Sequence, residues 1–279
     1  MAQVQNPDAR MRLNRFLARA GVSSRRHADQ LILSGSVSVN DQVVQELGVT
    51  VDPESDRVCV HGIPVRLGTN HKVLALNKPS GVYSTMSDPQ GRQCVADYLD
   101  PDRYAGYFHI GRLDRDTTGL LLFTNEGSLG NLLMHPSHHV EKTYIAQVEG
   151  TPSATQMRRL SQGVDIKVGK RVIRTAPAEA SVHTCKELES FNFDLSESCL
   201  EPDMKRTSFV KLTIHQGMKH QVKLMLGAVG HRVVKLHRIS FGPIELGSLK
   251  LGKTQLLTES QYRMLCKSAG ISDFPDSIE

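Results

Sequence analysis

The sequence has no apolar run near the roughly 20 residues that a membrane-spanning helix requires. Its first ten residues are polar and lack the apolar core of a signal peptide. Tryptophan is absent, and the five cysteines stand far apart, without the paired short spacing of zinc ligands. We therefore expect a cytoplasmic protein with free thiols, not a membrane protein or a disulfide scaffold.

Motifs for metals and cofactors are also missing. The nearest candidate is the group His135, His138 and His139, whose spacing would suit one face of a helix. Pro136 interrupts the helix that these histidines would need. We expect neither a metal nor a cofactor.

The composition is that of a globular protein, with 39% hydrophobic and 23% charged residues. A chain of 279 residues is long enough for a small domain and a larger one. The net charge of +5 favours a polyanionic partner, and its distribution is more informative than its total. Residues 11–40 hold five arginines and one acid, and residues 205–253 hold ten basic residues and one acid. Two basic surfaces are predicted, while residues 179–203, with seven acids, are typical of a solvated loop.

The N-terminal region predicts two helices. Leu13, Phe16, Leu17 and Ala20 lie at the spacing of one helical stripe that Gly21 ends. Ser23 or Ser24 can cap a second helix that runs to Leu33. The arginines would lie on another face of the first helix and in the first turn of the second, where they can face phosphate or simply solvent: Arg12, Arg15, Arg19, Arg25 and Arg26.

Short hairpin strands follow, because valines and isoleucines alternate with polar residues over 37–65 and turn residues interrupt them. The run Leu13-Asn-Arg-Phe-Leu-Ala-Arg-Ala-Gly-Val-Ser-Ser-Arg-Arg, with Gly-Ser-Val-Ser-Val-Asn40 after it, resembles the S4 RNA-binding module over residues 11–66. The resemblance implies that the two helices bind structured RNA. It does not define a reaction, since such modules accompany several kinds of RNA protein.

A second domain is expected after a linker at 67–72, where Val73–Leu76 predicts a buried strand. A charged turn further along leads into the apolar strand Leu120–Phe123 and places Asp114 at the strand entry, fixed by the fold yet open to a ligand. Taken alone, Asp114 could simply pair with Arg112 or Arg115 or cap the turn.

The run Gly111-Arg-Leu-Asp-Arg-Asp-Thr-Thr-Gly-Leu-Leu-Leu-Phe-Thr-Asn-Glu-Gly127 closely resembles the signature of the bacterial rRNA pseudouridine synthases. The likeness continues through Leu76-Asn-Lys-Pro-Ser-Gly, Leu133-Met-His-Pro, Glu141-Lys-Thr-Tyr-Ile-Ala and His220-Gln-Val-Lys, and covers 73 to about 265. The acidic insertion at 183–204 departs in length.

The resemblance implies that Asp114 is the catalytic carboxylate, either as a nucleophile or as the base of a glycal route. It implies that Arg112 helps to extrude the target nucleotide and that Tyr144 packs on the uracil and assists proton removal. Lys223, on a helix predicted within 217–230, would keep the carboxylate ionised. Taken alone, Tyr144 could be an ordinary core aromatic and Lys223 a solvent-facing lysine. Further RNA contacts are expected from Lys142, Lys219 and His220.

The predicted fold is α+β: an S4-like α-L domain at 11–66 and a catalytic domain at 73–270 on a mixed, largely antiparallel sheet, with tails at 1–10 and 271–279. The antiparallel detail comes from the resemblance. We expect a monomer that acts on ribosomal RNA or on an assembly intermediate. The runs Leu-Leu-Phe-Thr-Asn-Glu-Gly and Leu-Met-His-Pro and the S4 helices resemble the large-subunit enzymes, whereas His-Gln-Val-Lys resembles the small-subunit enzyme, so 23S rRNA is preferred to 16S rRNA. The alternatives are an RNA-binding or assembly protein that has lost catalysis, and an RNA-cleaving hydrolase, for which neither clustered acids nor a histidine pair is evident.

Overall fold

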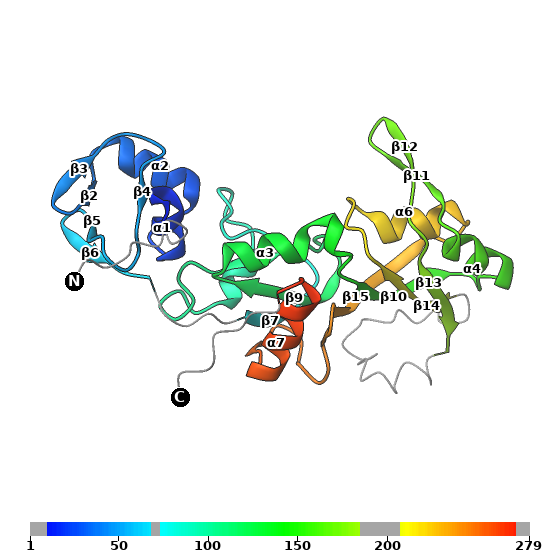
Figure 1. The fold of residues 1–279 in the computed structure, drawn as a ribbon. Coiled ribbons are helices and arrows are strands. Elements are labelled where there is room, and N and C mark those ends of the chain that lie inside the picture. The colour runs from blue at the N-terminus through cyan, green and yellow to red at the C-terminus, as the bar shows by residue number, and fades with distance from the viewer. Residues whose placement is uncertain (1–9, 68–72, 185–206, 272–279) are drawn as a thin grey trace. The chain divides into compact units, whose positions relative to one another are not determined.

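The computed structural model describes residues 10–67, 73–184 and 207–271, which fall into two compact units. The first contains residues 10–67 together with the segments 99–108 and 125–127. The second contains the remaining described residues. In Figure 1 the first unit begins in blue, and the second runs from cyan to red.

The first unit packs two helices on a small antiparallel sheet. Its core consists of the predicted helical stripe, Leu13, Phe16 and Leu17, together with Ala28, Ile32 and buried valines of the strands. The sheet has the order β3-β2-β5-β6. The elements are β1 (Met11–Arg12), α1 (Leu13–Arg19), α2 (Arg25–Leu33), β2 (Val37–Val39), β3 (Gln42–Val44), β4 (Thr50–Val51), β5 (Val58–Val60) and β6 (Ile63–Val65).

The start of each helix follows from local chemistry. Ser24 caps α2, because its side-chain oxygen accepts a hydrogen bond from the backbone N–H of His27. Helix α1 begins at Leu13, and Arg12 before it is extended and pairs with Thr50 in a short strand. The prediction that Arg12 shares a helical face with Arg15 and Arg19 is therefore wrong.

The second unit is built on a nine-stranded sheet with the order β13-β14-β10-β15-β9-β7-β17, with β16 on β15 and β8 on β9. The pairing of β9 with β15 is parallel, and the pairings along the rest of the order β13-β14-β10-β15-β9-β7-β17, as well as that of β16 with β15, are antiparallel. The strands are β7 (Val73–Lys78), β8 (Phe108–Ile110), β9 (Thr118–Thr124), β10 (Lys142–Glu149), β13 (Glu179–His183), β14 (Thr207–Ile214), β15 (Val233–Phe241), β16 (Ile244–Glu245) and β17 (Thr254–Leu256). The predicted α+β class with a mixed, largely antiparallel sheet is confirmed.

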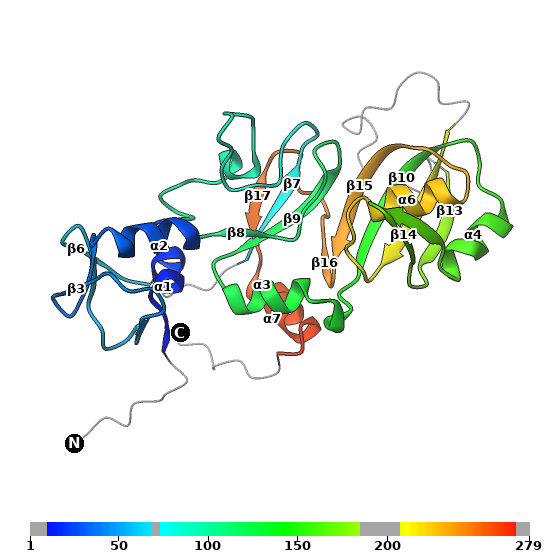
Figure 2. The same cartoon turned by 90° about the horizontal axis from the view of Figure 1, so that it is seen from above.

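Helices cover this sheet and shape its core. Helices α3 (Gly127–Met134) and α7 (Glu259–Ser268) lie side by side in Figures 1 and 2, and Leu129, Leu133 and Leu265 from them join one buried cluster with the strands. The other elements are η2 (Val95–Tyr98), η3 (Pro136–His138), α4 (Ala154–Ser161), the hairpin of β11 (Asp165–Val168) and β12 (Arg171–Arg174), and α6 (Gln221–Ala228). Within the described ranges, no helix has the length and apolar character needed to span a bilayer.

Helix α6 is shorter than the helix predicted within 217–230. It begins only at Gln221, because His220 has left-handed backbone angles, φ 54° and ψ 24°, which end any helical path through it. This conformation is uncommon for a residue with a side chain. It places His220 at the helix N-cap, directly before the turn that carries Lys223.

Candidate active site

The loop before β9 carries Asp114 and enters the sheet where β9 meets β15. At this parallel junction Thr118 pairs with His237, and Gly119 pairs with Arg238. Gly119 has φ +100°, and a Cβ added there would lie 2.3 Å from the carbonyl oxygen of Arg238. The strands can approach this closely only with glycine at position 119.

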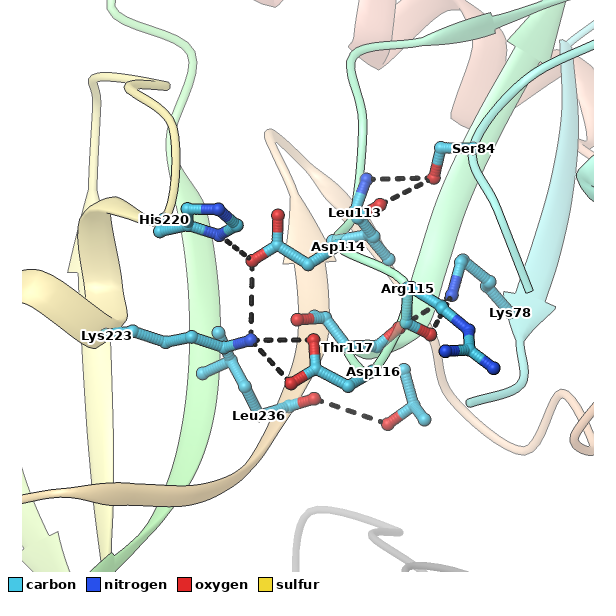
Figure 3. A network of polar contacts seen from close by, with 11 residues as sticks. Lys78, Ser84, Leu113, Asp114, Arg115, Asp116, Thr117, His220, Lys223 and Leu236 are labelled. Atoms are coloured by element: carbon cyan, nitrogen blue, oxygen red, sulfur yellow. Dashed lines mark hydrogen bonds and ion pairs between the residues drawn. The ribbon is translucent and has the colours of Figure 1, made fainter. Parts of the chain in front are cut away.

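Lys78 anchors the backbone of the loop that carries Asp114. It is the last residue of a strand that is buried throughout, and its own exposed fraction is 0%. Its ammonium donates to the carbonyl oxygens of Thr117 at 2.9 Å and Arg115 at 3.3 Å (Figure 3). It also donates to the carbonyl oxygen of Pro79 at 2.9 Å. Burial lowers the pKa of Lys78 to about 8, although the charges of Asp116 and Asp114 act in the opposite direction.

Ser84 holds the other side of the loop. Its hydroxyl donates to the carbonyl oxygen of Leu113 at 2.7 Å and accepts from the Leu113 N–H at 3.1 Å. The residue directly before Asp114 is therefore held by a reciprocal pair of buried hydrogen bonds, which Figure 3 shows beside the acid. Together, Lys78 and Ser84 place the Asp114 carboxylate by rigid contacts.

Two side chains from the start of α6 contact the carboxylate. Nδ1 of His220 lies 2.8 Å from Oδ2 of Asp114, and Nζ of Lys223 lies 3.4 Å from the same oxygen. Oδ1 of Asp114 accepts no hydrogen bond from any residue in the described part of the chain, and the side chain is 28% exposed. One oxygen is thus held by the protein, and the other is open (Figure 3).

Lys223 also binds Asp116, more closely than it binds Asp114. Its Nζ lies 2.7 Å and 2.8 Å from the two carboxylate oxygens of Asp116. Burial opposes the ionisation of Asp116, but the hydrogen bond and charge of Lys223 outweigh it and lower the pKa of Asp116. Lys223 therefore lies beside Asp114, as predicted from the sequence, but its ammonium is shared between two carboxylates.

Tyr144 lies on β10, in the row of the sheet that passes through Arg238 to Gly119. The side chain is buried, with 8% exposed, and the Arg238 guanidinium carbon lies 6.0 Å from the centre of its ring. Arg238 is itself buried and donates from Nε to the carbonyl oxygen of Leu120 at 2.7 Å. The row links Tyr144 to the strand that the Asp114 loop enters.

The remaining predicted residues differ in their surroundings. Arg112 and Lys219 are exposed, as are Arg15, Arg25 and Arg26 in the first unit. Arg19 is half-buried and attracted by the charge of Glu126, so it is not a freely solvated arginine.

Lys142 and His220 do not have the free side chains expected of RNA contacts. The Lys142 ammonium donates to the carbonyl oxygens of Val140 at 2.7 Å and His215 at 3.5 Å. Burial, and then the charge of Arg238, lower its pKa to about 8. These contacts hold the Lys142 side chain within the fold. The side chain of His220 is hydrogen-bonded to Asp114. Among the described residues, no group of three or more histidine, cysteine, aspartate or glutamate side chains could hold a metal ion.

Comparison with known proteins places this site in a family. Residues 72–228 match the model of the RNA pseudouridylate synthase family, and residues 11–58 match the S4 domain. The chain is 40% identical over 256 residues to ribosomal large subunit pseudouridine synthase B of Bacillus subtilis, covering 91% of this chain and 95% of that one. It is 39% identical over 264 residues to an uncharacterized RNA pseudouridine synthase of Mycobacterium leprae, with 94% of each chain covered.

A crystal structure of a pseudouridylate synthase shares the fold, with a TM-score of 0.60 and 28% identity over 91% of this chain and 99% of that one. The family match covers more than half of the sequence. The chain therefore belongs to the RNA pseudouridylate synthase family, with an S4 domain at its N-terminal end. It is an isomerase, as the resemblance noted in the sequence implied.

Proposed function

We propose that this enzyme isomerises a uridine of ribosomal RNA to pseudouridine and that Asp114 is its catalytic carboxylate. The names of the relatives support the substrate class. The observation that carries the assignment is the state of Asp114: a rigid loop holds it, two side chains hold its Oδ2, and its Oδ1 is open.

The reaction breaks the bond between uracil N1 and ribose C1′, turns the base, joins C5 to C1′, releases the C5 proton to solvent and protonates N1 from solvent. One proton leaves and one returns, so the product is an isomer and no external oxidant or reductant enters. Asp114 can attack C1′ through Oδ1, or it can remove a ribose proton to start a glycal route. In both routes the carboxylate must be ionised and aimed at the sugar.

Lys223 and His220 hold the carboxylate in place. The Lys223 ammonium lies 3.4 Å from Oδ2 of Asp114, close enough to attract its negative charge. His220 orients Oδ2 by its hydrogen bond, so we assign it a positioning role instead of an RNA contact. Asp116 also binds Lys223, but its side chain is 70% exposed. We therefore assign Asp116 to adjusting the charge around Lys223 and not to the reaction itself.

Tyr144 and Arg112 are assigned to the base itself. The target uridine must leave its stack to reach Asp114. Tyr144 offers a ring in the row of the sheet next to the loop, suited to pack on a flat base. Arg112 is exposed two residues before Asp114 and can occupy the gap that the extruded nucleotide leaves.

The exposed Arg15, Arg25 and Arg26 of the first unit are assigned to phosphate, with Lys219 as a further contact near the site. Arg12, outside the helix, and the half-buried Arg19 are weaker candidates. Deleting residues 1–66 should weaken RNA binding and flatten its salt dependence. Unchanged salt slopes would contradict a phosphate role for this unit.

We propose 23S rRNA as the substrate, supported by the large-subunit name of the Bacillus subtilis relative. The second candidate is 16S rRNA, which the motif His220-Gln-Val-Lys223 favours because it resembles that of the small-subunit enzyme. Either substrate, free or in an assembling particle, implies work in the cytoplasm, where we propose that the enzyme acts as a monomer.

Mapping pseudouridines by carbodiimide in both rRNAs tests the proposal. A strain that lacks the gene should lose one pseudouridine from 23S rRNA and regain it with the wild-type gene. Loss from 16S rRNA instead would transfer the assignment to the second candidate. Unchanged maps in both rRNAs would refute the proposed substrate class.

A further inference from the structure

The second unit carries a third basic region, in addition to the two predicted from the sequence. Residues 154–175 contain six basic residues and one acid, Asp165. They belong to α4 and to the β11–β12 hairpin, and all six are exposed: Arg158, Arg159, Lys167, Lys170, Arg171 and Arg174.

Two of these arginines have structural partners. Arg159 donates to the carbonyl oxygen of Ala228 at 3.3 Å. Arg174 donates to the carbonyl oxygen of Gln162 at 3.4 Å and lies 3.6 Å from the carboxylate of Asp165. These contacts hold the base of the hairpin and use the one acid of the region.

The cations nearer the tip differ, because Lys167, Lys170 and Arg171 make no ion pair or side-chain hydrogen bond with any described residue. The strand register separates the two faces of the hairpin: Ile166 pairs with Ile173, and Lys167 pairs with Val172. Ile166 is buried at 2% exposure, whereas Val172 on the opposite face is 72% exposed. The exposed Val172 therefore lies on the same face as Lys167.

The β11–β12 hairpin adjoins the helix that carries Lys223. Strand β11 packs against α6, the helix whose first residues follow His220 and include Lys223. Figure 1 shows the hairpin projecting beyond α6. Eight helical residues span roughly 12 Å, a length that a few nucleotides of RNA can cover.

We propose that the exposed end of the β11–β12 hairpin, with Lys167 and Val172 on one face and Lys170 and Arg171 at the tip, is an RNA-binding surface, which grips the substrate a few nucleotides from the uridine held at Asp114. Lys167, Lys170 and Arg171 contact phosphates, and Val172 packs on a sugar or base. This inference rests on the proposed function, since it takes the substrate to be RNA. It adds a contact surface separate from the S4 helices and from the active site.

The test measures binding to an rRNA fragment at several salt concentrations by filter retention. The hairpin variant carries Lys167→Gln, Lys170→Gln and Arg171→Gln. Its matched control carries Arg92→Gln, Arg263→Gln and Lys267→Gln, three exposed basic residues elsewhere in the same unit. The hairpin variant should bind about tenfold or more weakly near 0.1 M salt, and its salt slope should fall by about 2, at 0.7 to 0.9 per lost phosphate contact. The control should match the wild type.

A third variant, Val172→Ser, should weaken binding severalfold and leave the salt slope unchanged, since it removes no charge. Circular dichroism and thermal midpoints confirm that each variant is folded. Equal affinity and slope for the hairpin variant and its control would overturn the proposal. Normal binding to naked rRNA with weaker binding to ribosomal particles would also overturn it, because the hairpin would then meet a ribosomal protein. Failure of the proposed function is recognised separately, by the pseudouridine maps, which do not depend on these affinities.

Discussion

Replacing Gly119 by alanine tests whether the close junction of β9 and β15 positions the active site. The added Cβ would lie 2.3 Å from the carbonyl oxygen and 2.7 Å from the nitrogen of Arg238, so the strands must separate by about 1 Å to restore ordinary contact. Alanine at φ +100° also adds backbone strain of about 1 to 3 kcal/mol. Overpacking adds about 1 to 3 kcal/mol, so we expect a total destabilisation of about 2 to 6 kcal/mol.

The same shift should reduce turnover. The loop that carries Asp114 enters β9 directly before this junction, and a displacement of about 1 Å can lower a rate by roughly 100-fold. Urea unfolding reports the stability, and tritium release from C5-labelled uridine in rRNA reports the turnover of the variant that remains folded.

Gly127→Ala is the matched control. Gly127 begins α3 and has open space where a Cβ would stand, so its replacement should change stability by less than about 1 kcal/mol and leave turnover unchanged. If Gly119→Ala unfolds at the same urea concentration as this control and retains wild-type turnover, the reasoning about the junction is refuted.

Three further predictions concern the groups around Asp114. Lys223→Gln should lower kcat by about 100-fold or more, while Lys223→Arg should retain part of the rate because it keeps the positive charge. Equal rates of tritium release by the two variants would contradict the role of charge. His220→Ala should lower kcat by about tenfold, as expected for one orienting hydrogen bond, with RNA affinity nearly unchanged in filter binding; a loss of affinity alone would return His220 to the RNA contacts. Because the folded pKa of Lys78 is about 8 and its ordinary value is 10.5, the unfolded chain binds more protons between these pH values, and this lysine makes stability rise with pH over that window. Urea midpoints from pH 7 to 10 should show a smaller rise for Lys78→Met than for the wild type, and parallel curves would contradict the assignment.

Several features of the fold could be predicted because local patterns determine them. The stripe Leu13, Phe16 and Leu17 predicts α1, since burial at helical spacing leaves few alternatives. Ser24 predicts the start of α2 through its capping oxygen. The buried strands at 73–78 and 118–124 follow from their apolar residues.

The features that sequence reasoning missed depend on contacts between distant residues. His220 and Asp114 are 106 positions apart, and their hydrogen bond depends on a left-handed backbone that no residue pattern predicts. Lys78 gave a partial signal, a charged residue at the end of an apolar strand, but the three carbonyl oxygens that it binds come from a turn and a remote loop. The inclusion of segments 99–108 and 125–127 in the first unit was missed for the same reason.

The central claim is that the carboxylate of Asp114 performs the isomerisation. The most direct measurement compares tritium release from C5-labelled uridine in rRNA by the wild-type enzyme and by Asp114→Asn, a change that keeps the shape of the side chain and removes its charge. The account predicts release by the wild type and none by the variant, with RNA affinity within severalfold. Release by Asp114→Asn at a rate near that of the wild type would contradict it.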